Sequence, residues 1–567
     1  MIKTRVFLYS IFAVLLFAAC EKDSIEKSEN EDIEVVEDDD DYTWNASSAV
    51  EINLNGTSIS CSSSKVSIAD NKATITSAGQ YLISGTLTDG QIQVNTSDEG
   101  SVKLILNGVT MSCSNSAPLY VVNAEKAVII SAENTTNTIT DASTYTYASG
   151  EDEPNAAIFS KADLIIYGDG QLVVHGNYND AISSKDGLII KNSPITVQAT
   201  DDGIRGKDYL YLDNPVLNVT AGGDGLKSDN EDNTSAGFIT ITSGEISITA
   251  GGDGISAITN VNITDGVYNI KTGGGSTYSV STTSAKGMKA GDSLNISCET
   301  MIINSADDAI HSDGNLAINS GTYTISTADD GIHAEQSLNI EDGDITISKS
   351  YEGIEGVTIT INGGNIHVTA SDDGINAAGG STVSTQYGNT TSGNMFINGG
   401  YVVVNSTGDG VDVNGSITMA AGTVIIQGPT NSGNGAIDYD GTFKVTGGCV
   451  IAAGSSGMAQ APSSSSSQYS LLINLSSTQQ AGVLICIQKS DGTNVLCFKP
   501  TKTYQSLALS SSLLENGKSY NVYLGGSSTG TLTDGVYEGG AYTTGTKYTS
   551  FTVSSIVTSI GNNNGRP

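Results

Sequence analysis

Pairs of adjacent acids recur along the middle of this chain. The segment TADDGIHAEQSL, residues 327–338, is preceded 22 residues upstream by SADDAIHSDGNL and followed 22 residues downstream by KSYEGIEG. A tight turn uses one Asp, so the second carboxylate indicates another role. Ca²⁺ takes several carboxylate and carbonyl oxygens at about 2.3–2.6 Å, and so suits stacked acids. The motif predicts calcium binding; the alternative is that Asp-Gly only forms turns and the acids are solvated.

Aligning the repeats on the second acid gives one central residue per repeat. In order, these are Asp180, Asp202, Asp224, Asp253, Lys286, Asp308, Asp330, Glu352, Asp373 and Asp409. The residues three positions further on, from the second repeat, are Arg205, Lys227, Ser256, Lys289, His311, His333, Glu355, Asn376 and Asp412. The early members are basic and the late ones are oxygen ligands. We therefore expect a basic groove on the middle repeats and calcium on the later ones.

The predicted calcium ligands are carboxylates and one amide of these repeats. They are Asp201, Asp202, Asp224, Asp253, Asp307, Asp308, Asp329, Asp330, Glu352, Glu355, Asp372, Asp373, Asn376, Asp409 and Asp412. His311 and His333 fall in adjacent repeats, but two histidines without a third soft ligand make a poor zinc site. Lys286 stands where other repeats have an acid, so it either neutralises its neighbours or acts as a general base.

The repeat itself predicts an all-β, right-handed parallel β-helix of about 22 residues per coil. In DDGIHAEQSLNIEDGDITIS, the alternating apolar residues predicted to face inward are Ile332, Leu338, Ile340, Ile345 and Ile347. A leucine-rich repeat needs its own Leu and Asn spacing, which is missing, and a propeller blade needs about twice the length. One internal stack is expected to contain Ile182, Ile204, Leu226, Ile255, Met288, Ile310, Ile332, Ile354, Ile375 and Val411.

Four regions are predicted. Residues 1–19 have Lys3 and Arg5 before an apolar run, which is typical of a secretory signal, and Ala18-Ala19-Cys20 resembles a bacterial lipobox. Cys20 is therefore the expected lipidation site, with ordinary cleavage near an incidental cysteine as the alternative. Residues 20–46 are rich in acids and read as a disordered tether. The β-helix is assigned to residues 47–460 and a C-terminal β-structured cap to residues 461–567, because an open solenoid end would template aggregation.

The net charge and the cysteines narrow the function classes. A formal charge of −36 argues against nucleic acid or an anionic membrane surface as a direct partner. Seven cysteines in 567 residues do not make a disulfide scaffold. Cys486 and Cys497 face each other across a predicted two-residue Asp491-Gly492 turn, at a hydrogen-bonded pair that suits a bridge poorly. A disulfide and two buried thiols both remain open.

With these motifs in place, the chain resembles a family of bacterial cell-surface carbohydrate-binding proteins. The resemblance runs from GQYLISGTLTDGQIQVN to SFTVSSIVTSIG, and DDAIHS, DDGIHAE, SYEGIEG, DDGINAAGG and GDGVDVNG carry most of it. It implies a right-handed parallel β-helix that binds calcium and plant-type polysaccharides such as polygalacturonate or cellulose. The implied fold is similar to that of calcium-dependent pectate lyases, in which aspartates on neighbouring coils hold the ion and a lysine abstracts a proton.

From this resemblance, the lipobox and the export-signal-like Glu21-Lys22-Asp23 after Cys20, we expect a monomeric, lipid-anchored protein of the outer membrane and cell surface. It would bind polysaccharide through a calcium-bearing face without catalysis, and would touch the membrane only through its lipid. The expected glycan contacts are Arg205, Lys227, Lys289, His311, His333 and Tyr351, with Tyr178, Tyr209 and Tyr211 as further aromatic platforms. A pectate-type lyase is one alternative, and its candidate catalytic residues are Lys286, Lys289, Arg205 and Lys207. A surface adhesin or structural module is the other.

Overall fold

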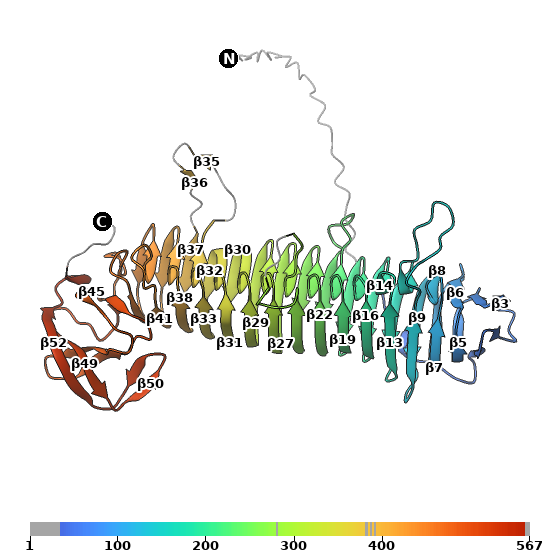
Figure 1. The fold of residues 1–567 in the computed structure, drawn as a ribbon, viewed down its shortest axis with the longest axis horizontal. Coiled ribbons are helices and arrows are strands. Elements are labelled where there is room, and N and C mark those ends of the chain that lie inside the picture. Colours follow the sequence, from blue (N-terminus) through green and yellow to red (C-terminus); the bar gives the residue numbers. More distant parts are fainter. Residues whose placement is uncertain (1–34, 279–281, 380–383, 386–387, 390–392, 562–567) are drawn as a thin grey trace, which may run out of the picture.

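The strands of this protein stack into one elongated parallel solenoid (Figure 1). The computed structural model describes residues 35–278, 282–379, 384–385, 388–389 and 393–561. Within these ranges there is no α-helix, only the 3-10 turn η1 (Asp39–Tyr42), and no helix could cross a membrane. The predicted all-β class with a parallel, solenoid-like sheet is confirmed. The predicted signal peptide, Cys20 and the first part of the predicted tether lie outside the described residues.

Each coil contributes strands to three parallel faces. The first face contains β4 (Lys72–Ile75), β6 (Gln91–Asn95), β8 (Leu119–Asn123), β11 (Ala156–Ser160), β14 (Asp180–Ser184), β17 (Ile204–Gly206), β20 (Leu226–Ser228), β23 (Ile255–Ala257), β26 (Met288–Ala290), β28 (Ile310–Ser312), β34 (Ile375–Ala377), β39 (Val411–Val413) and β42 (Ile437–Tyr439). The second face contains β9 (Lys126–Ser131), β12 (Asp163–Tyr167), β15 (Gly187–Lys191), β18 (Tyr209–Asp213), β21 (Phe238–Ile241), β24 (Asn260–Ile263), β37 (Asn394–Ile397), β40 (Ser416–Met419) and β43 (Phe443–Val445).

The third face contains β10 (Thr136–Thr140), β13 (Gln171–Gly176), β16 (Pro194–Ala199), β19 (Val216–Ala221), β22 (Glu245–Ala250), β25 (Val267–Thr272), β31 (Asp344–Ser350), β33 (Asn365–Ala370), β38 (Tyr401–Ser406), β41 (Thr423–Gln427) and β44 (Cys449–Gly454). Longer strands turn from one face into the next. They are β1 (Val50–Gly56), β5 (Gly79–Leu87), β7 (Ser101–Ser112), β27 (Ser293–Ser305), β29 (Asn315–Thr327), β30 (Ile332–Ile340) and β32 (Ile354–Ile361). Near the start of the chain, β2 (Ile59–Ser60) pairs with β1 and β3 (Val66–Ala69) with β4, both antiparallel; β35 (Ser384–Thr385) and β36 (Gly388–Asn389) form a separate hairpin.

The interior of the solenoid is an aliphatic stack in the register that the repeat predicts. Ile332 pairs with Ile310 in the preceding coil and with Ile354 in the following one. All ten residues of the predicted internal stack are buried, none of them more than 3% exposed. Branched side chains at equivalent positions contact each other coil after coil, so burial of apolar surface favours this register over its neighbours.

The C-terminal region adds antiparallel strands to the last coil. Strand β48 (Tyr504–Ser510) pairs with β44 and with β45 (Ser470–Gln479), which also pairs with β53 (Val557–Ile560). A second, six-stranded antiparallel sheet contains β46 (Ile485–Lys489), β47 (Asn494–Phe498), β49 (Ser519–Ser528), β50 (Thr531–Thr533), β51 (Val536–Glu538) and β52 (Tyr542–Thr552). Its apolar side packs on outward-facing Val403, Ile425 and Ile451 of the third face. The region thus covers both the strand edge of the last coil and part of its outer surface.

The cysteine hairpin differs from its prediction. Gly492 N–H donates to the Lys489 carbonyl, and Gly492 has φ +90°, so the turn is centred one residue earlier and is followed by a bulge. Cys486 and Cys497 lie opposite each other with a Cα separation of 4.1 Å and form a disulfide. That separation is typical of a non-hydrogen-bonded pair, which accommodates a bridge. The predicted hydrogen-bonded pairing was wrong because the bulge residue was not counted.

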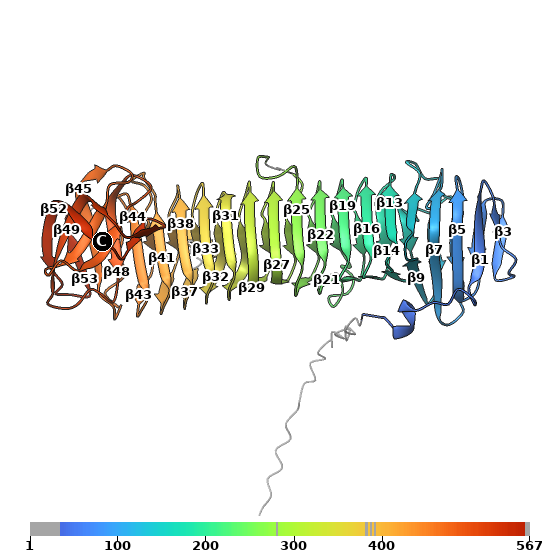
Figure 2. The same ribbon diagram turned by 90° about the horizontal axis from the view of Figure 1, so that it is seen from below.

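Residues 35–46 lie against the solenoid rather than forming part of a disordered tether. Figure 2 shows η1 beside β9. Lys126 contacts Asp41 at 2.6 Å, and Lys191 contacts Glu37 at 2.6 Å. The outward-facing apolar side chains in the same cluster are Ile105, Val128, Ile130, Ile165, Ile189 and Tyr209. The predicted disorder fails for this stretch because its acids meet buried lysines and its Val, Tyr and Trp side chains cover apolar surface.

We expect Ile332→Asp to lower the free energy of unfolding by about 3–5 kcal/mol, because the carboxylate would be buried without a partner. Ile332→Val should cost about 1 kcal/mol. Ile302→Asp is the matched control: Ile302 is 44% exposed on the outer side of β27, so its loss should stay within about 0.5 kcal/mol. Denaturant unfolding measures all three; equal losses at positions 332 and 302 would contradict the assigned register.

Candidate functional site

The central acids occupy the turn that leads into each strand of the first face, and one oxygen of most of them is used for structure. Asp202 Oδ1 accepts the backbone N–H of Asp224 at 2.8 Å, and Asp224 Oδ1 accepts that of Asp253 at 2.8 Å. Asp330 Oδ1 accepts the N–H of Glu352 at 3.0 Å in the same way. We call this row of central residues the central ladder. Its carboxylates hold successive turns together, which leaves mainly their second oxygens for other partners.

On the middle coils, those second oxygens contact basic side chains. Lys227 Nζ lies 3.0 Å from both Asp202 and Asp224. Lys286 Nζ lies 2.6 Å from Asp308 and 2.9 Å from Asp307. Basic residues therefore neutralise the ladder here, which is the first of the two roles predicted for Lys286.

Arg205 is engaged in the same way. Its guanidinium lies 2.9 Å from Asp229 and 4.0 Å from Asp180. Asp229 was not among the predicted site residues, because it falls outside the aligned repeat positions.

The groove on the middle coils is acidic, which corrects the predicted basic groove. It encloses about 670 Å³ beside β20 and β23. The acids that line it are Asp201, Asp202, Asp224, Asp229, Glu231, Asp253 and Asp313, against the two lysines Lys227 and Lys289. The prediction followed one position per coil and missed the acids of the neighbouring turns. Lys289 is the basic residue of this groove that forms no ion pair within the described part of the chain.

On the later coils, carboxylates gather in a stretch of the chain, residues 350–443, that contains no lysine or arginine. One oxygen from each of Asp373, Asp409 and Asp412 lies within 4.8 Å of the others. Nearby, Asn376 donates to Glu352 at 2.8 Å, while its own buried Oδ1 accepts no hydrogen bond from any described residue. Three carboxylates and a buried amide oxygen form the hard donor set that Ca²⁺ prefers, so these residues fit the predicted ion.

Burial and mutual repulsion alter the acidity of the ladder. Burial, and then repulsion from Asp308, raise the pKa of Asp330 to about 8. Burial raises the pKa of Glu352 to about 7, against the opposing hydrogen bond from Asn376. Burial also raises the pKa of Asp409 to about 7, and Asp373 adds repulsion. A nearby cation would favour the charged forms, so this surface gains stability from binding one.

Other predicted ligands fall into smaller groups. Asp201 and Asp202 lie with Asp180, and Asp307 and Asp308 with Asp329. Asp180 Oδ2 is buried and forms no hydrogen bond with a described residue. Sequence alignment had placed Asp180 in the ladder but not among the ligands, although its position in the repeat was a sufficient signal.

Asp224, Asp253 and Asp372 belong to none of these groups. Asp224 contacts Lys227, as described above. Asp253 Oδ1 accepts from Ser284 Oγ at 2.6 Å. Asp372 contacts the exposed Tyr351, and this hydrogen bond raises the pKa of Tyr351 to about 12.

The predicted aromatic platforms differ in accessibility. Tyr351 is 48% exposed, but Tyr209 is 2% exposed and its hydroxyl accepts the N–H of Val36. Tyr178 stacks on Tyr145 with ring centroids 4.3 Å apart, a pair that the sequence did not indicate because Tyr145 lies outside the repeat. Tyr209 is thus not available as a platform.

Three of the four residues proposed for a lyase, Lys286, Arg205 and Lys207, are engaged in ion pairs. Burial alone would lower the pKa of Lys286, but Asp308 and Asp307 raise it above its usual range. Burial alone would lower the pKa of Arg205, but the hydrogen bond with Asp229 raises it. Lys207 pairs with Asp232 at 3.1 Å. A general base of this type needs a lowered pKa, so Lys286 and Arg205 do not suit that role.

Comparison with known proteins places the chain in a family. A family model described as "Carbohydrate-binding domain-containing protein" matches residues 69–331 and 329–491, which is most of the chain. The chain belongs to this family. A family relative from Acetivibrio thermocellus, with the same description, is 39% identical over 135 residues, or 24% of this chain. The match spans 47% of that relative, about half its length.

A solved structure is also similar. It is described as the polysaccharide lyase-like protein from C. thermocellum, in a gadolinium derivative, and is 32% identical to this member of the family. The match covers 44% of this chain and 97% of that one, with a TM-score of 0.40.

The raised pKa values predict a pH dependence for the metal-free protein. An acid whose folded pKa is raised stabilises the fold below its unfolded pKa and loses that contribution as pH rises through its folded pKa. With Asp330 near 8 and Glu352 and Asp409 near 7, chelator-treated protein should lose stability between about pH 4 and 8. Asp330→Asn should flatten this slope, whereas the exposed Asp344→Asn should not. Thermal unfolding at a series of pH values measures this loss of stability. Stability that rises with pH across this window would contradict the raised pKa values of these acids.

Proposed function

We propose that this protein is a non-catalytic, polysaccharide-binding lipoprotein whose later coils hold calcium. Membership of the carbohydrate-binding family supports the ligand class. The observation that carries the metal is the group formed by Asp373, Asp409 and Asp412, whose carboxylate oxygens converge in a stretch of the chain, residues 350–443, that contains no lysine or arginine. The ion pairs of Lys286 and Arg205 favour binding over lyase chemistry.

Calcium would be held by Asp373, Asp409 and Asp412, with Asn376 Oδ1 and Glu352 beside them. When bound, it supplies the positive charge that these coils lack. The chain's own residues orient these ligands. The backbone N–H of Asp409 donates to Asp373 Oδ1 at 2.6 Å, so the second carboxylate oxygen of Asp373 keeps one direction. Tyr351 lies one turn earlier and is exposed beside Asp372.

The ligand we propose is an acidic, pectin-like polysaccharide. An acidic surface repels a polyuronate unless a cation lies between the two sets of carboxylates. The later coils offer that arrangement, and Lys289 offers a direct positive contact in the middle groove. A polyuronate extended along the solenoid would meet a new coil about every 4.8 Å. Neutral glycans would depend on exposed aromatic rings such as Tyr351 and Tyr278, because Tyr209 is covered.

The remaining features of the proposal concern shape and location. The solenoid is a right-handed β-helix, and the C-terminal strands act as its cap, since β48 occupies the edge of β44 that an additional coil would use and β45 pairs with β48 in turn. The protein acts as a monomer on the outer membrane, displayed at the cell surface by a lipid on Cys20. The docked residues 35–46 would then set the point at which the chain leaves the solenoid toward the membrane.

Removing calcium should lower the melting temperature and weaken retention of polygalacturonate together. An ion at a thousandfold its dissociation constant stabilises the folded state by about 4 kcal/mol. Asp373→Asn combined with Asp409→Asn should reproduce the effect of chelator and show no further response to it. Asp344→Asn, an exposed acid outside the ladder, should behave as wild type. The measurements are thermal unfolding and glycan retention with EGTA and after calcium is restored.

Three results would count against this function. Melting and retention that ignore chelator in demonstrably calcium-free protein would leave the acids as turn formers. Retention that survives the double substitution would place the glycan elsewhere. An ultraviolet-absorbing unsaturated product from polygalacturonate would show a lyase, contrary to the non-catalytic proposal.

The lipid anchor has its own test. Metabolic labelling with a palmitate analogue should mark the wild-type protein, and Cys20→Ala should abolish the label because the acylated thiol is removed. Cys61→Ala is the matched control and should retain it, since Cys61 lies within the solenoid fold. Label on the Cys20→Ala protein would show that Cys20 is not the anchor.

A further inference from the structure

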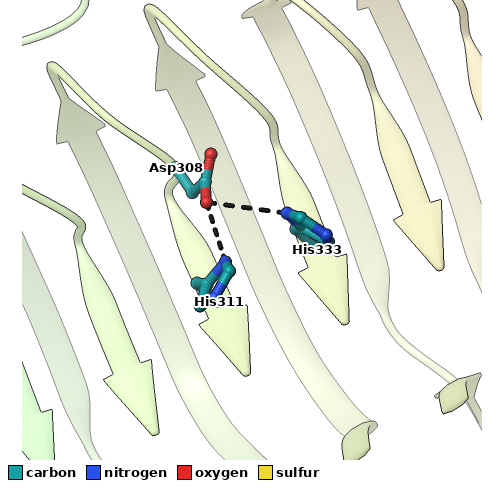
Figure 3. Close-up of side chains that lie close together, drawn as sticks. All are labelled: Asp308, His311 and His333. Atoms are coloured by element: carbon teal, nitrogen blue, oxygen red, sulfur yellow. Dashed lines mark ion pairs between the residues drawn. The ribbon is translucent and has the colours of Figure 1, made fainter. Parts of the chain in front are cut away.

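Two histidines and an aspartate on adjacent coils converge at one point of the first face. Asp308 lies in the turn before β28, His311 in β28 and His333 in the neighbouring β30 (Figure 3). Asp308 Oδ2 lies 2.8 Å from His311 Nδ1 and 3.7 Å from His333 Nδ1. The ligand atoms of the three side chains all lie within 4.8 Å of one another. Stacking of adjacent coils thus brings His333 to the Asp308–His311 pair, and Asp308 supplies a third ligand that the sequence analysis did not count with the two histidines.

The nitrogen of His311 that faces Asp308 is buried and lacks a hydrogen bond. The His311 side chain is 8% exposed and that of Asp308 5%. Although His311 Nδ1 lies close to Asp308 Oδ2, the contact does not have hydrogen-bond geometry, and no other described atom bonds this nitrogen. A ring nitrogen and a carboxylate oxygen are both electron-rich, so their close approach favours a cation between or beside them.

The opposite nitrogen of His311 has the partner that is typical of a metal-bound histidine. His311 Nε2 lies 2.8 Å from Asp313 Oδ1. When Nε2–H donates to that carboxylate, Nδ1 keeps its lone pair and points at Asp308. Metal-ligating histidines usually donate their second N–H to a carboxylate or carbonyl, which fixes the tautomer and the ring orientation. His333 has a similar arrangement at longer range, with Nε2 3.6 Å from Glu355.

The separations fit a small metal ion better than calcium. With bonds of about 2.0–2.1 Å, two ligands at the corners of a tetrahedron lie roughly 3.4 Å apart. The distances from Asp308 Oδ2 to His311 Nδ1, 2.8 Å, and to His333 Nδ1, 3.7 Å, lie on either side of that value. Imidazole nitrogens suit zinc, copper, nickel and iron, whereas calcium selects oxygen.

One cation already competes for this point. Lys286 Nζ contacts the same Asp308 oxygen at 2.6 Å and has Asp307 as a second partner at 2.9 Å. Four acids, Asp313, Asp330, Glu335 and Glu355, also lie around the histidines, against one further base, Lys289, which is the strand partner of His311 in the preceding coil. The surroundings therefore favour a cation, and Lys286 can remain paired with Asp307 when Asp308 takes another partner.

We propose that Asp308 Oδ2, His311 Nδ1 and His333 Nδ1 form a site for a divalent transition metal of the zinc class. It is separate from the calcium proposed on the later coils, and it does not depend on that proposal. Three protein ligands leave a fourth position open, as in zinc sites that bind water or a ligand oxygen. His333 also lines a hollow of about 240 Å³ with Glu335 and Glu355, so a glycan oxygen could reach the vacant position.

The test uses Co²⁺ alone, because its visible absorption strengthens when it leaves octahedral water for a site of four or five ligands. Titration of the chelator-treated full chain should give one such site. His311→Gln and His333→Gln should each weaken binding by at least about tenfold. His367→Gln is the matched control and should bind as wild type, because His367 lies on the third face beside Asp534. Lys286→Met should tighten binding, since it removes the competing cation.

The outcomes separate this site from the calcium proposal. Excess Ca²⁺ should leave the cobalt spectrum unchanged, and Asp373→Asn with Asp409→Asn should retain it. A spectrum that stays that of aqueous Co²⁺, or one that survives both histidine substitutions, would overturn the proposal. So would stoichiometric displacement of cobalt by calcium. Circular dichroism of each variant before titration establishes that the coils are folded.

Discussion

The structure depends on one constraint: each residue of a coil lies next to its equivalent in the adjacent coil at the spacing of paired strands, about 4.8 Å. For apolar residues this arrangement is favourable, and the stack through Ile310, Ile332 and Ile354 is buried throughout. For carboxylates it is unfavourable, because like charges then stand side by side in a poorly solvated turn. Most other features of the first face can be understood as ways of compensating for that repulsion.

Three kinds of compensation occur along the solenoid. One carboxylate oxygen accepts the backbone N–H of the following turn, as between Asp202 and Asp224. On the middle coils, Lys227 and Lys286 pair with the second oxygens. Around Asp308, His311 and His333 lie beside the same carboxylate as Lys286, whereas the groups gathered around Asp373 are other acids, which add to the repulsion. The chemistry of the first face thus changes from ion-paired, through nitrogen-containing, to oxygen-only, which is why we assign different ions to different coils.

Segments from the two ends of the described chain cover parts of the outer surface of the solenoid. Residues 35–46 cover apolar and lysine side chains of the second face, and the C-terminal strands cover Ile425 and Ile451 of the third face. The first face carries the hollows beside Lys227 and His333, consistent with its proposed role in binding.

The sequence alone determined the register, the period and the members of the internal stack, because a solenoid repeats its contacts at a fixed interval that alignment reveals. It also indicated that Glu355, Asn376 and Asp412 follow His333 in one row, which pairing of the strands bears out. What it did not indicate came from residues outside the repeat. Asp229 and Asp313 lie in turns of irregular length, and their proximity to Arg205 and His311 depends on how those turns fold back. The tertiary structure decided three features: the acidic character of the middle groove, the docking of residues 35–46, and the meeting of Asp308 with both histidines. Each depends on distances between coils and turns, and spacing along the chain does not specify those distances.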